Sequence, residues 1–240
     1  MKPTIVPSIA ILALTLLLSG CVMNRVNPEP QTIVLREAAG AALRVEIDPG
    51  AQWSSRMQAG PFIFNVLPQF AIWTEDDAGR LVETLYVTGA DFRGMRHAEK
   101  NEKQAEFFAQ ILPFWSARVT SSGAPLPSKA NPYPDAITSA TPTGPTTLVT
   151  ALTGSVGAAA AVTVYLEINK SGDSNSTFRA DNDPAGQPSL IYAGHLGAGA
   201  TRLELIGHGG RLPDEPAVYT DLSGFDTALE LVASIVVTLE

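Results

Sequence analysis

A two-residue alternation of apolar and charged side chains is the sequence feature that most constrains the fold of this chain. From Leu43 to Asp48 every second residue is apolar and the residues between are charged, and the turn pair Pro49-Gly50 follows. Neighbouring side chains of a strand point to opposite faces of a sheet. This segment therefore predicts a strand with one buried and one solvated face.

Other segments have strand composition, and turn residues separate them. They are Phe62 to Val66, Phe70 to Glu75, Leu81 to Val87, Thr147 to Leu152, Val162 to Ile168, Ser189 to Ala193, Thr201 to Ile206 and Leu229 to Leu239. The turn sequence Asp76-Asp77-Ala78-Gly79 joins two of them into an expected hairpin, and Val232 and Val236 suggest a central position for the last strand. Many short strands with Gly/Pro turns indicate an all-β, β-sandwich-like fold.

One segment is typical of a helix. Ala98 to Ile111 is rich in Glu, Lys, Ala and Gln, and Leu112-Pro113 ends it. Only its C-terminal end is amphipathic, so we expect this one short helix, around residues 98–111, to lie over an open sheet edge or barrel mouth.

The same alternation predicts one core and its solvated counterpart. The side chains expected inside are Leu43, Val45, Ile47, Val162, Val164, Leu166, Ile168, Leu203, Leu205, Leu231, Ile235 and Val237. Those expected outside are Arg44, Glu46, Thr163, Glu167, Arg202 and Glu204.

The N-terminus has the pattern of a bacterial lipoprotein leader. Lys2 precedes the apolar run Ile5 to Leu18, and Leu18-Ser19-Gly20-Cys21 resembles the lipobox, whose cysteine receives a diacylglycerol thioether before cleavage. The run is shorter than the ~20 residues that span a bilayer. We therefore expect a signal peptide over residues 1–20, lipid attachment at Cys21 and a mature protein anchored to the membrane.

The remaining chain divides into a tether and a domain. Residues 21–31 are polar and contain Pro28 and Pro30, which predicts an extended, lipid-anchored tether. We expect residues 32–240 to form a single β-rich extracytoplasmic domain, with two small domains joined at 121–145 as the alternative. Under the sorting rule of enteric bacteria, Val22 favours a periplasm-facing lipoprotein of the outer membrane.

Composition excludes two classes of function. Cys21 is the only cysteine, so its acylation leaves no thiol for a disulfide, a zinc site or a nucleophile. The leader holds one of the 16 basic residues and none of the 24 acidic ones, which leaves 15 basic residues in the mature chain and a formal charge of −9. Binding of nucleic acid through a basic surface is therefore not expected.

The sequence lacks common catalytic motifs. It has no P-loop, no His-Glu-x-x-His helix and no Gly-x-Ser-x-Gly elbow, so no catalytic residue is predicted. His195 and His208 follow strands beside glycines, where turn histidines are favoured over a zinc site. The loop 169–188 is rich in Asp and Asn, as calcium sites are, but it lacks EF-hand spacing. A turn without an ion is favoured there, and no metal is predicted.

A long irregular loop is predicted at Ser121 to Pro145, which carries six prolines, and one motif lies within it. Asp135-Ala136-Ile137-Thr138-Ser139-Ala140-Thr141 resembles the attachment sequence of the FMN-binding domains of sodium-pumping quinone reductases. In that family a periplasmic flavin transferase esterifies FMN to the last Thr or Ser. Ser139 stands where the family usually has Gly.

The resemblance implies covalent FMN on the hydroxyl of Thr141. Asp135, Thr138 and Ala140 would complete the motif, and Trp115 or Tyr133 would be the aromatic side chain that stacks on the flavin. We expect the Thr141 hydroxyl to be accessible, because prolines should keep the loop out of a sheet ladder.

A wider resemblance covers most of the mature chain. Its segments are Pro68 to Trp73, Leu85 to Thr88, Leu112 to Trp115, Asp135 to Thr141 and Gly186 to Tyr192. They look like an uncharacterised family of predicted periplasmic β-rich proteins and lipoproteins linked to extracytoplasmic flavin and haem redox systems. The resemblance implies β-sandwich character and an envelope redox neighbourhood, without a reaction. For Trp73, Phe114 and Trp115, core packing is favoured over ligand stacking.

Two functions from different classes follow from these observations. The first is a cofactor-free, lipid-anchored module that binds a ligand or partner at the cell envelope and is not an enzyme. The second is a carrier of covalent FMN in extracytoplasmic electron transfer, with envelope redox proteins and a flavin transferase as partners. Exposure of the Thr141 hydroxyl separates the two, because a flavin transferase must reach it.

Overall fold

The computed structural model describes residues 29–37, 42–59, 61–88, 100–127, 137–139, 141–152, 162–179, 186–197, 199–210 and 217–240. Its elements are β1 (Gln31–Arg36), β2 (Ala42–Pro49), β3 (Ser55–Ala59), β4 (Phe62–Val66), β5 (Gln69–Glu75), β6 (Leu81–Thr88), α1 (Lys100–Ile111), α2 (Pro113–Ser121), β7 (Ile137–Ser139), β8 (Thr146–Ala151), β9 (Val162–Asn169), β10 (Leu190–Leu196), β11 (Ala200–Arg202), β12 (Glu204–Gly209), β13 (Val218–Tyr219), the 3-10 helix η2 (Thr227–Glu230) and β14 (Val232–Leu239). The expected signal peptide, Cys21 and most of the expected tether lie outside the described residues.

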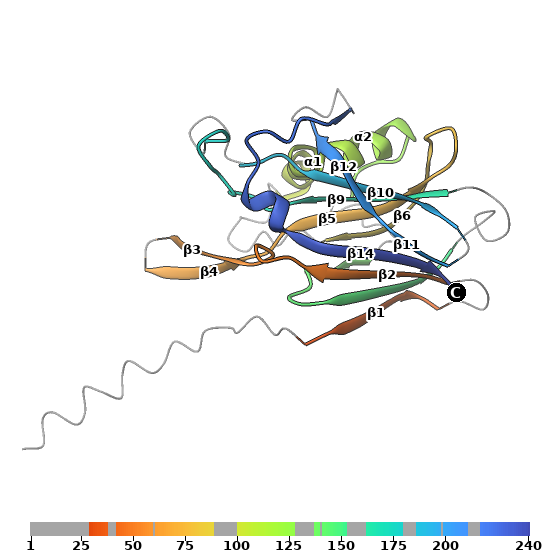
Figure 1. Ribbon diagram of the computed structural model, residues 1–240. Coiled ribbons are helices and arrows are strands. Elements are labelled where there is room, and N and C mark those ends of the chain that lie inside the picture. Colours follow the sequence, from red (N-terminus) through yellow and green to blue (C-terminus); the bar gives the residue numbers. More distant parts are fainter. Residues whose placement is uncertain are drawn as a thin grey trace, which may run out of the picture.

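Within these residues, the strands form two stacked sheets and a separate hairpin, β3–β4, which projects from the body (Figure 1). The order is β1-β8-β2-β14-β11 in the five-stranded sheet and β13-β12-β10-β9-β5-β6-β7 in the seven-stranded sheet. Most neighbours are antiparallel, but β1 runs parallel to β8 and β7 parallel to β6. Each sheet combines strands from both halves of the chain, so the predicted β-sandwich-like, strand-dominated fold is confirmed.

The space between the two sheets is filled by apolar side chains from both. The alternating segment forms β2, and its Leu43, Val45 and Ile47 are at most 2% exposed and belong to this cluster. All the side chains predicted to be inside are buried, except Leu205, which is partly buried. The expected hairpin forms from β5 and β6, and β14 lies between β2 and β11, as its apolar faces predicted.

The two helices cover the outer face of the seven-stranded sheet (Figure 1). The expected helix is α1, but it lies over a sheet face rather than an edge or a barrel mouth. Pro113 follows α1 and then begins α2, a helix that the sequence did not predict. Proline suits this first position because the N–H that it lacks would have no partner within the helix.

This helical layer corrects two predictions about burial. The buried apolar residues form two clusters, one between the sheets and one under the helices, rather than one core. Glu167, expected outside, is 0% exposed because α2 covers its side of β9. The other residues predicted outside are exposed or partly exposed.

Three segment boundaries also differ from the predictions. The stretch 121–145 is not wholly irregular, because β7 pairs with β6 in the described part of it. The single strand expected at Thr201 to Ile206 divides at Leu203, where the chain passes from β11 in one sheet to β12 in the other. The expected strand Leu229 to Leu239 begins as the end of η2, and an unpredicted strand, β1, starts at Gln31.

Candidate functional site

Thr141, the candidate flavin-attachment residue, is covered by the protein. It is 9% exposed, and its hydroxyl donates a hydrogen bond to the carbonyl oxygen of Pro68 at 2.7 Å. The prediction of an accessible hydroxyl is therefore wrong, because the three residues of β7 pair with β6 and hold the segment against the sheet. That pairing is open to them because none of the three is a proline.

The remaining residues of the motif are only partly described. Thr138 lies in β7 opposite Val87 of β6. Asp135, Ala140 and Tyr133 lie outside the described residues.

An open hollow of about 270 Å³ lies beside the Thr141 segment. Its lining residues are Pro49, Gly50, Ala51, Trp53, Ser54, Thr143, Gly144 and Pro145. Trp53 joins the two sides of the hollow, since its indole Nε1 donates to the carbonyl oxygen of Pro142 at 2.8 Å. Its ring packs against Phe70, with the ring centroids 5.9 Å apart. The turn after β2 is thus tied to the stretch that follows Thr141.

The backbone around Gly50 gives the hollow a fixed shape. A Cβ atom on Gly50 would lie 2.0 Å from the carbonyl oxygen of Glu230, so only glycine fits. The Gly50 N–H donates to Leu231 and the Gln52 N–H to Glu230, which holds the turn against η2 and the residue after it. Sequence analysis identified Pro49-Gly50 as a turn but missed Trp53, whose only signal is an aromatic residue directly after that turn.

The chemistry available in the hollow is that of binding. Its lining holds an indole ring, the hydroxyls of Ser54 and Thr143, and backbone groups, but no carboxylate, amine, imidazole or thiol. General acid–base catalysis needs a group that titrates near the working pH. The hollow can therefore offer apolar contact and hydrogen bonds from hydroxyl and backbone groups.

Glu167 is the most strongly perturbed carboxyl group of the described residues, and it lies at the start of α2. Its Oε2 accepts from the Trp115 N–H at 2.7 Å, and its Oε1 accepts from the Phe114 N–H at 3.2 Å and the Ser189 hydroxyl at 2.6 Å. Complete burial raises the pKa of Glu167 to about 7, although these hydrogen bonds oppose the shift. The residue preceding α2, Leu112, provides no side-chain cap, so a strand carboxyl group caps this helix instead.

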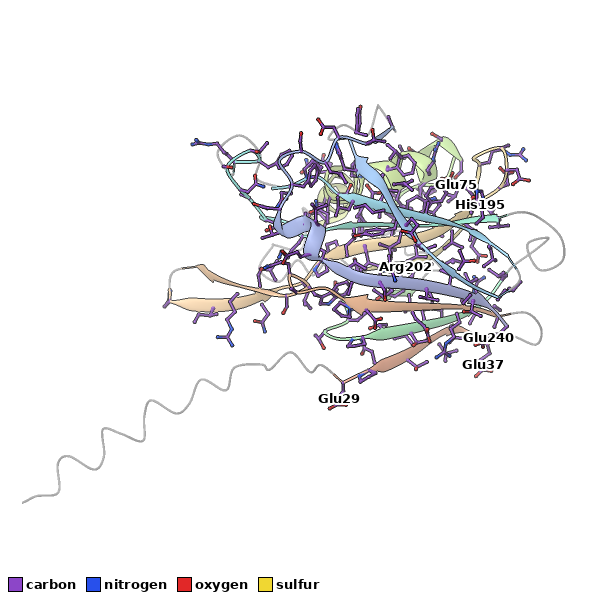
Figure 2. The ribbon with its side chains drawn as sticks, viewed as in Figure 1. Glu29, Glu37, Glu75, His195, Arg202 and Glu240 are labelled. Atoms are coloured by element: carbon purple, nitrogen blue, oxygen red, sulfur yellow. The ribbon has the colours of Figure 1, made fainter. Side chains whose placement is uncertain are left out.

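A second buried carboxylate, Glu75 at the end of β5, binds the same helix (Figure 2). Its Oε1 accepts from the Trp73 indole N–H at 2.9 Å and lies 3.0 Å from Arg118 Nε. The Arg118 guanidinium also lies over the Phe114 ring, 4.7 Å from its centroid. Burial raises the pKa of Glu75, and the Trp73 and Arg118 contacts oppose the rise. Both carboxylates thus act in the docking of α2 on the sheet.

The aromatic residues of the family resemblance pack in the core, as favoured. Trp73 stacks on Tyr165 with centroids 5.2 Å apart, and Phe114 is 3% exposed. Trp115 is 0% exposed, and its Nε1 donates to the Thr84 hydroxyl at 3.1 Å. Trp115 is therefore not available to stack on a flavin at Thr141, whereas Trp53 contacts the residue next to Thr141.

The two histidines that follow strands make local contacts. His195 is exposed (Figure 2), and its Nδ1 lies 2.9 Å from the Thr163 hydroxyl. The ring of His208 stacks on Tyr219 with centroids 5.3 Å apart. Across the described residues, no group of three His, Cys, Asp or Glu side chains could hold a metal ion.

Among the described helices, none has the length and apolar character that crossing a bilayer requires. Comparison of the chain with family models, with curated proteins and with solved structures found no match.

Proposed function

We propose that this chain is a lipid-anchored cell-envelope domain that acts as a non-enzymatic interaction or ligand-binding module, with the hollow beside Trp53 as its binding surface. It would face the periplasm and be held at the outer membrane through lipid on Cys21. One observation carries the proposal. The hollow has a backbone that is held in place at Gly50, and its lining is mainly apolar and contains no titratable side chain. The covered hydroxyl of Thr141 favours this cofactor-free module over a flavin carrier.

The position of the hollow suits a tethered protein. Pro145 lines the hollow, and its carbonyl oxygen accepts from the N–H of Gln31, the first residue of β1, at 3.0 Å. The hollow therefore lies at the end of the sandwich where the chain enters β1. Glu29 lies just before this strand (Figure 2). Gln31 follows Cys21 by ten residues, which span at most about 35 Å. A lipid on Cys21 would thus hold the hollow close to the membrane surface.

Site-specific photocrosslinking in the native host tests the binding surface. A photoreactive residue at Ala51, which is exposed and lines the hollow, is expected to give a discrete adduct. The same residue at Glu204, which is exposed on β12 of the seven-stranded sheet, is the matched control and should give none. When the photoreactive residue at position 51 is combined with Trp53→Ala, the adduct should disappear, because the indole ring lines the hollow. Equal labelling at positions 51 and 204 would show that the hollow is not the binding surface.

A second candidate function rests on the motif Asp135 to Thr141. A flavin carrier would hold FMN through a phosphoester on Thr141 and relay electrons to envelope redox proteins, with FMN supplying the redox chemistry. Among the described residues, Trp53 is then a candidate to stack on the flavin, because its indole contacts Pro142, the residue after Thr141. This function requires the Thr141 hydroxyl to leave the Pro68 carbonyl before a transferase can use it.

Coexpression with a flavin transferase separates the two functions. The module predicts a band without flavin fluorescence after denaturing electrophoresis, because the Thr141 hydroxyl is covered. A fluorescent band that Thr141→Ala abolishes and Thr143→Ala retains would establish the carrier. The transferase must label a known substrate in the same cells, so that a dark band counts against the carrier.

A further inference from the structure

Within the described part of the chain, three buried side-chain oxygens at the start of the β9–β10 connection have no hydrogen-bond partner. They are Asn169 Oδ1, Ser171 Oγ and Asp173 Oδ2, which lie within five residues of sequence. Asn169 is only 3% exposed. Buried oxygens in folded proteins almost always accept a hydrogen bond or bind a water molecule or an ion. Three unpartnered oxygens in one short segment therefore point to a ligand.

Contacts with Gln187 bring Asn169 and Asp173 to the same place. The Gln187 carbonyl oxygen accepts from Asn169 Nδ2 at 2.7 Å, and the Gln187 N–H donates to the Asp173 carbonyl oxygen at 2.9 Å. Between them the chain makes a tight turn, in which the Asp173 N–H donates to the Lys170 carbonyl oxygen. Gly186 packs so closely that a Cβ atom on it would lie 2.7 Å from the Asp173 backbone. Gln187 thus contacts both the Asn169 side chain and the Asp173 backbone, which brings these two residues to one place.

Two carboxylate side chains lie close to each other at this place. The Thr227 hydroxyl lies 2.7 Å from Asp173 Oδ1 and 3.1 Å from Asp226 Oδ1, so a single hydroxyl separates two carboxylates. That hydroxyl has one proton and can donate to only one of them at a time. The neighbouring amine of Lys170 is directed elsewhere, to the carbonyl oxygen of Gln52 at 2.9 Å. Two close carboxylates are more stable with a cation between them.

We propose that Asn169, Ser171 and Asp173 bind a hard divalent cation, with Asp226 as the second carboxylate at the site. Carboxylate, amide and hydroxyl oxygens are ligands for hard cations, and an irregular set of this kind suits calcium better than magnesium, which demands near-octahedral geometry. Only two of the four residues are acidic, so the set differs from a cluster of three His, Cys, Asp or Glu side chains.

The cation site would also stabilise the hollow. Asp226 caps η2, because its side chain accepts from the Thr227 N–H, and the last residue of η2, Glu230, accepts from the Gln52 N–H. Lys170 donates to the carbonyl oxygen of Gln52. A cation that orders residues 169–173 and the start of η2 therefore fixes the turn that lines the hollow. This inference does not depend on what the hollow binds.

Calcium titration of the purified full chain tests the proposal. After treatment with a chelator, calcium at about a hundredfold excess over Kd should raise Tm by roughly 5–10 °C, because the ligand binds only the folded state. Asp173→Asn should abolish the rise by removing one carboxylate charge with little change in shape. Asp77→Asn, the same substitution in the exposed turn between β5 and β6, should retain it.

A gain-of-function variant keeps the test decisive if Asp173→Asn fails to fold. Ser171→Asp adds a third carboxylate, so it should bind calcium at least about tenfold more tightly by calorimetry and be less stable than the parent in chelator. An unchanged Tm of the parent with calcium, together with no binding by Ser171→Asp, would overturn the proposal. The unpartnered oxygens would then be satisfied by water.

Discussion

Replacing Glu167 with Ala is expected to lower the free energy of unfolding by about 3–5 kcal/mol. The substitution leaves the N–H groups of Phe114 and Trp115 and the hydroxyl of Ser189 without their acceptor in a fully buried place. Each buried donor without a partner costs about 1–3 kcal/mol. Urea unfolding followed by tryptophan fluorescence measures the loss.

Glu204→Ala is the matched control, because it removes the same side chain from an exposed position of the same sheet. Its effect should stay within about 0.5 kcal/mol of the parent. If Glu167→Ala is as stable as Glu204→Ala, the carboxyl group does not hold α2 on the sheet.

The raised pKa of Glu167 also predicts how the free energy of unfolding depends on pH. The pKa of Glu167 is about 7 in the folded protein, against 4.5 for the ordinary carboxyl group. Between these values the folded state retains a proton that the unfolded state has released, so stability should fall as pH rises from 4.5 to 7 and change little above that. The difference in pKa corresponds to a change of the order of 3 kcal/mol.

Glu167→Gln cannot titrate and should flatten this slope. Glu75, whose pKa is also raised by burial, contributes a slope of the same sign in both proteins, so the difference between parent and variant isolates Glu167. Parallel stability curves for the parent and Glu167→Gln from pH 4.5 to 7 would contradict the assigned pKa.

The second large effect is expected from Cys21→Ser, which should move the protein almost completely from the membrane fraction to the soluble fraction. The acyl chains that a lipoprotein cysteine carries contribute about 0.8 kcal/mol for each buried methylene group, and serine cannot form the thioether. Fractionation of the native host followed by immunoblotting measures the distribution, and intact mass shows whether the leader has been removed.

Asn24→Ser, which introduces the same residue three positions further along the tether, is the control and should stay with the membrane. Because acylation precedes cleavage, a Cys21→Ser protein that keeps its leader can stay in the membrane with either kind of anchor, so the intact mass of the parent protein decides between them. A parent protein that keeps its leader and carries no acyl chains would show that the leader itself spans the bilayer. In that case the proposed lipid anchor is wrong, while the fold and the hollow are unaffected.

The strands of this protein could be predicted because their signals are local. Alternation in β2, the turn between β5 and β6, and the apolar faces of β14 each follow from neighbouring residues. The same locality explains why the inner face of β2 was assigned correctly: Leu43, Val45 and Ile47 point to one side whatever lies opposite.

Whether the second face of a strand is buried depends on which element covers it, and a local sequence pattern does not predict that element. Glu167 alternates with apolar neighbours and has the polarity of a solvated residue, yet α2 closes over it and uses it as a cap. The existence of α2 was itself hidden, because a proline that ends one helix can also begin another.

Contacts between distant segments decided the candidate sites. The sequence by itself identified Thr141 as a candidate, because its motif is a local property, but composition alone favoured a turn without an ion for the Asp- and Asn-rich loop after β9. Only the tertiary structure placed the Thr141 hydroxyl against Pro68, 73 residues away, and Trp53 against Pro142, 89 residues away. It also brought Thr227 between Asp173 and Asp226. The accessibility of a hydroxyl and the charge around a carboxylate depend on such partners, which chain folding selects and sequence spacing does not reveal.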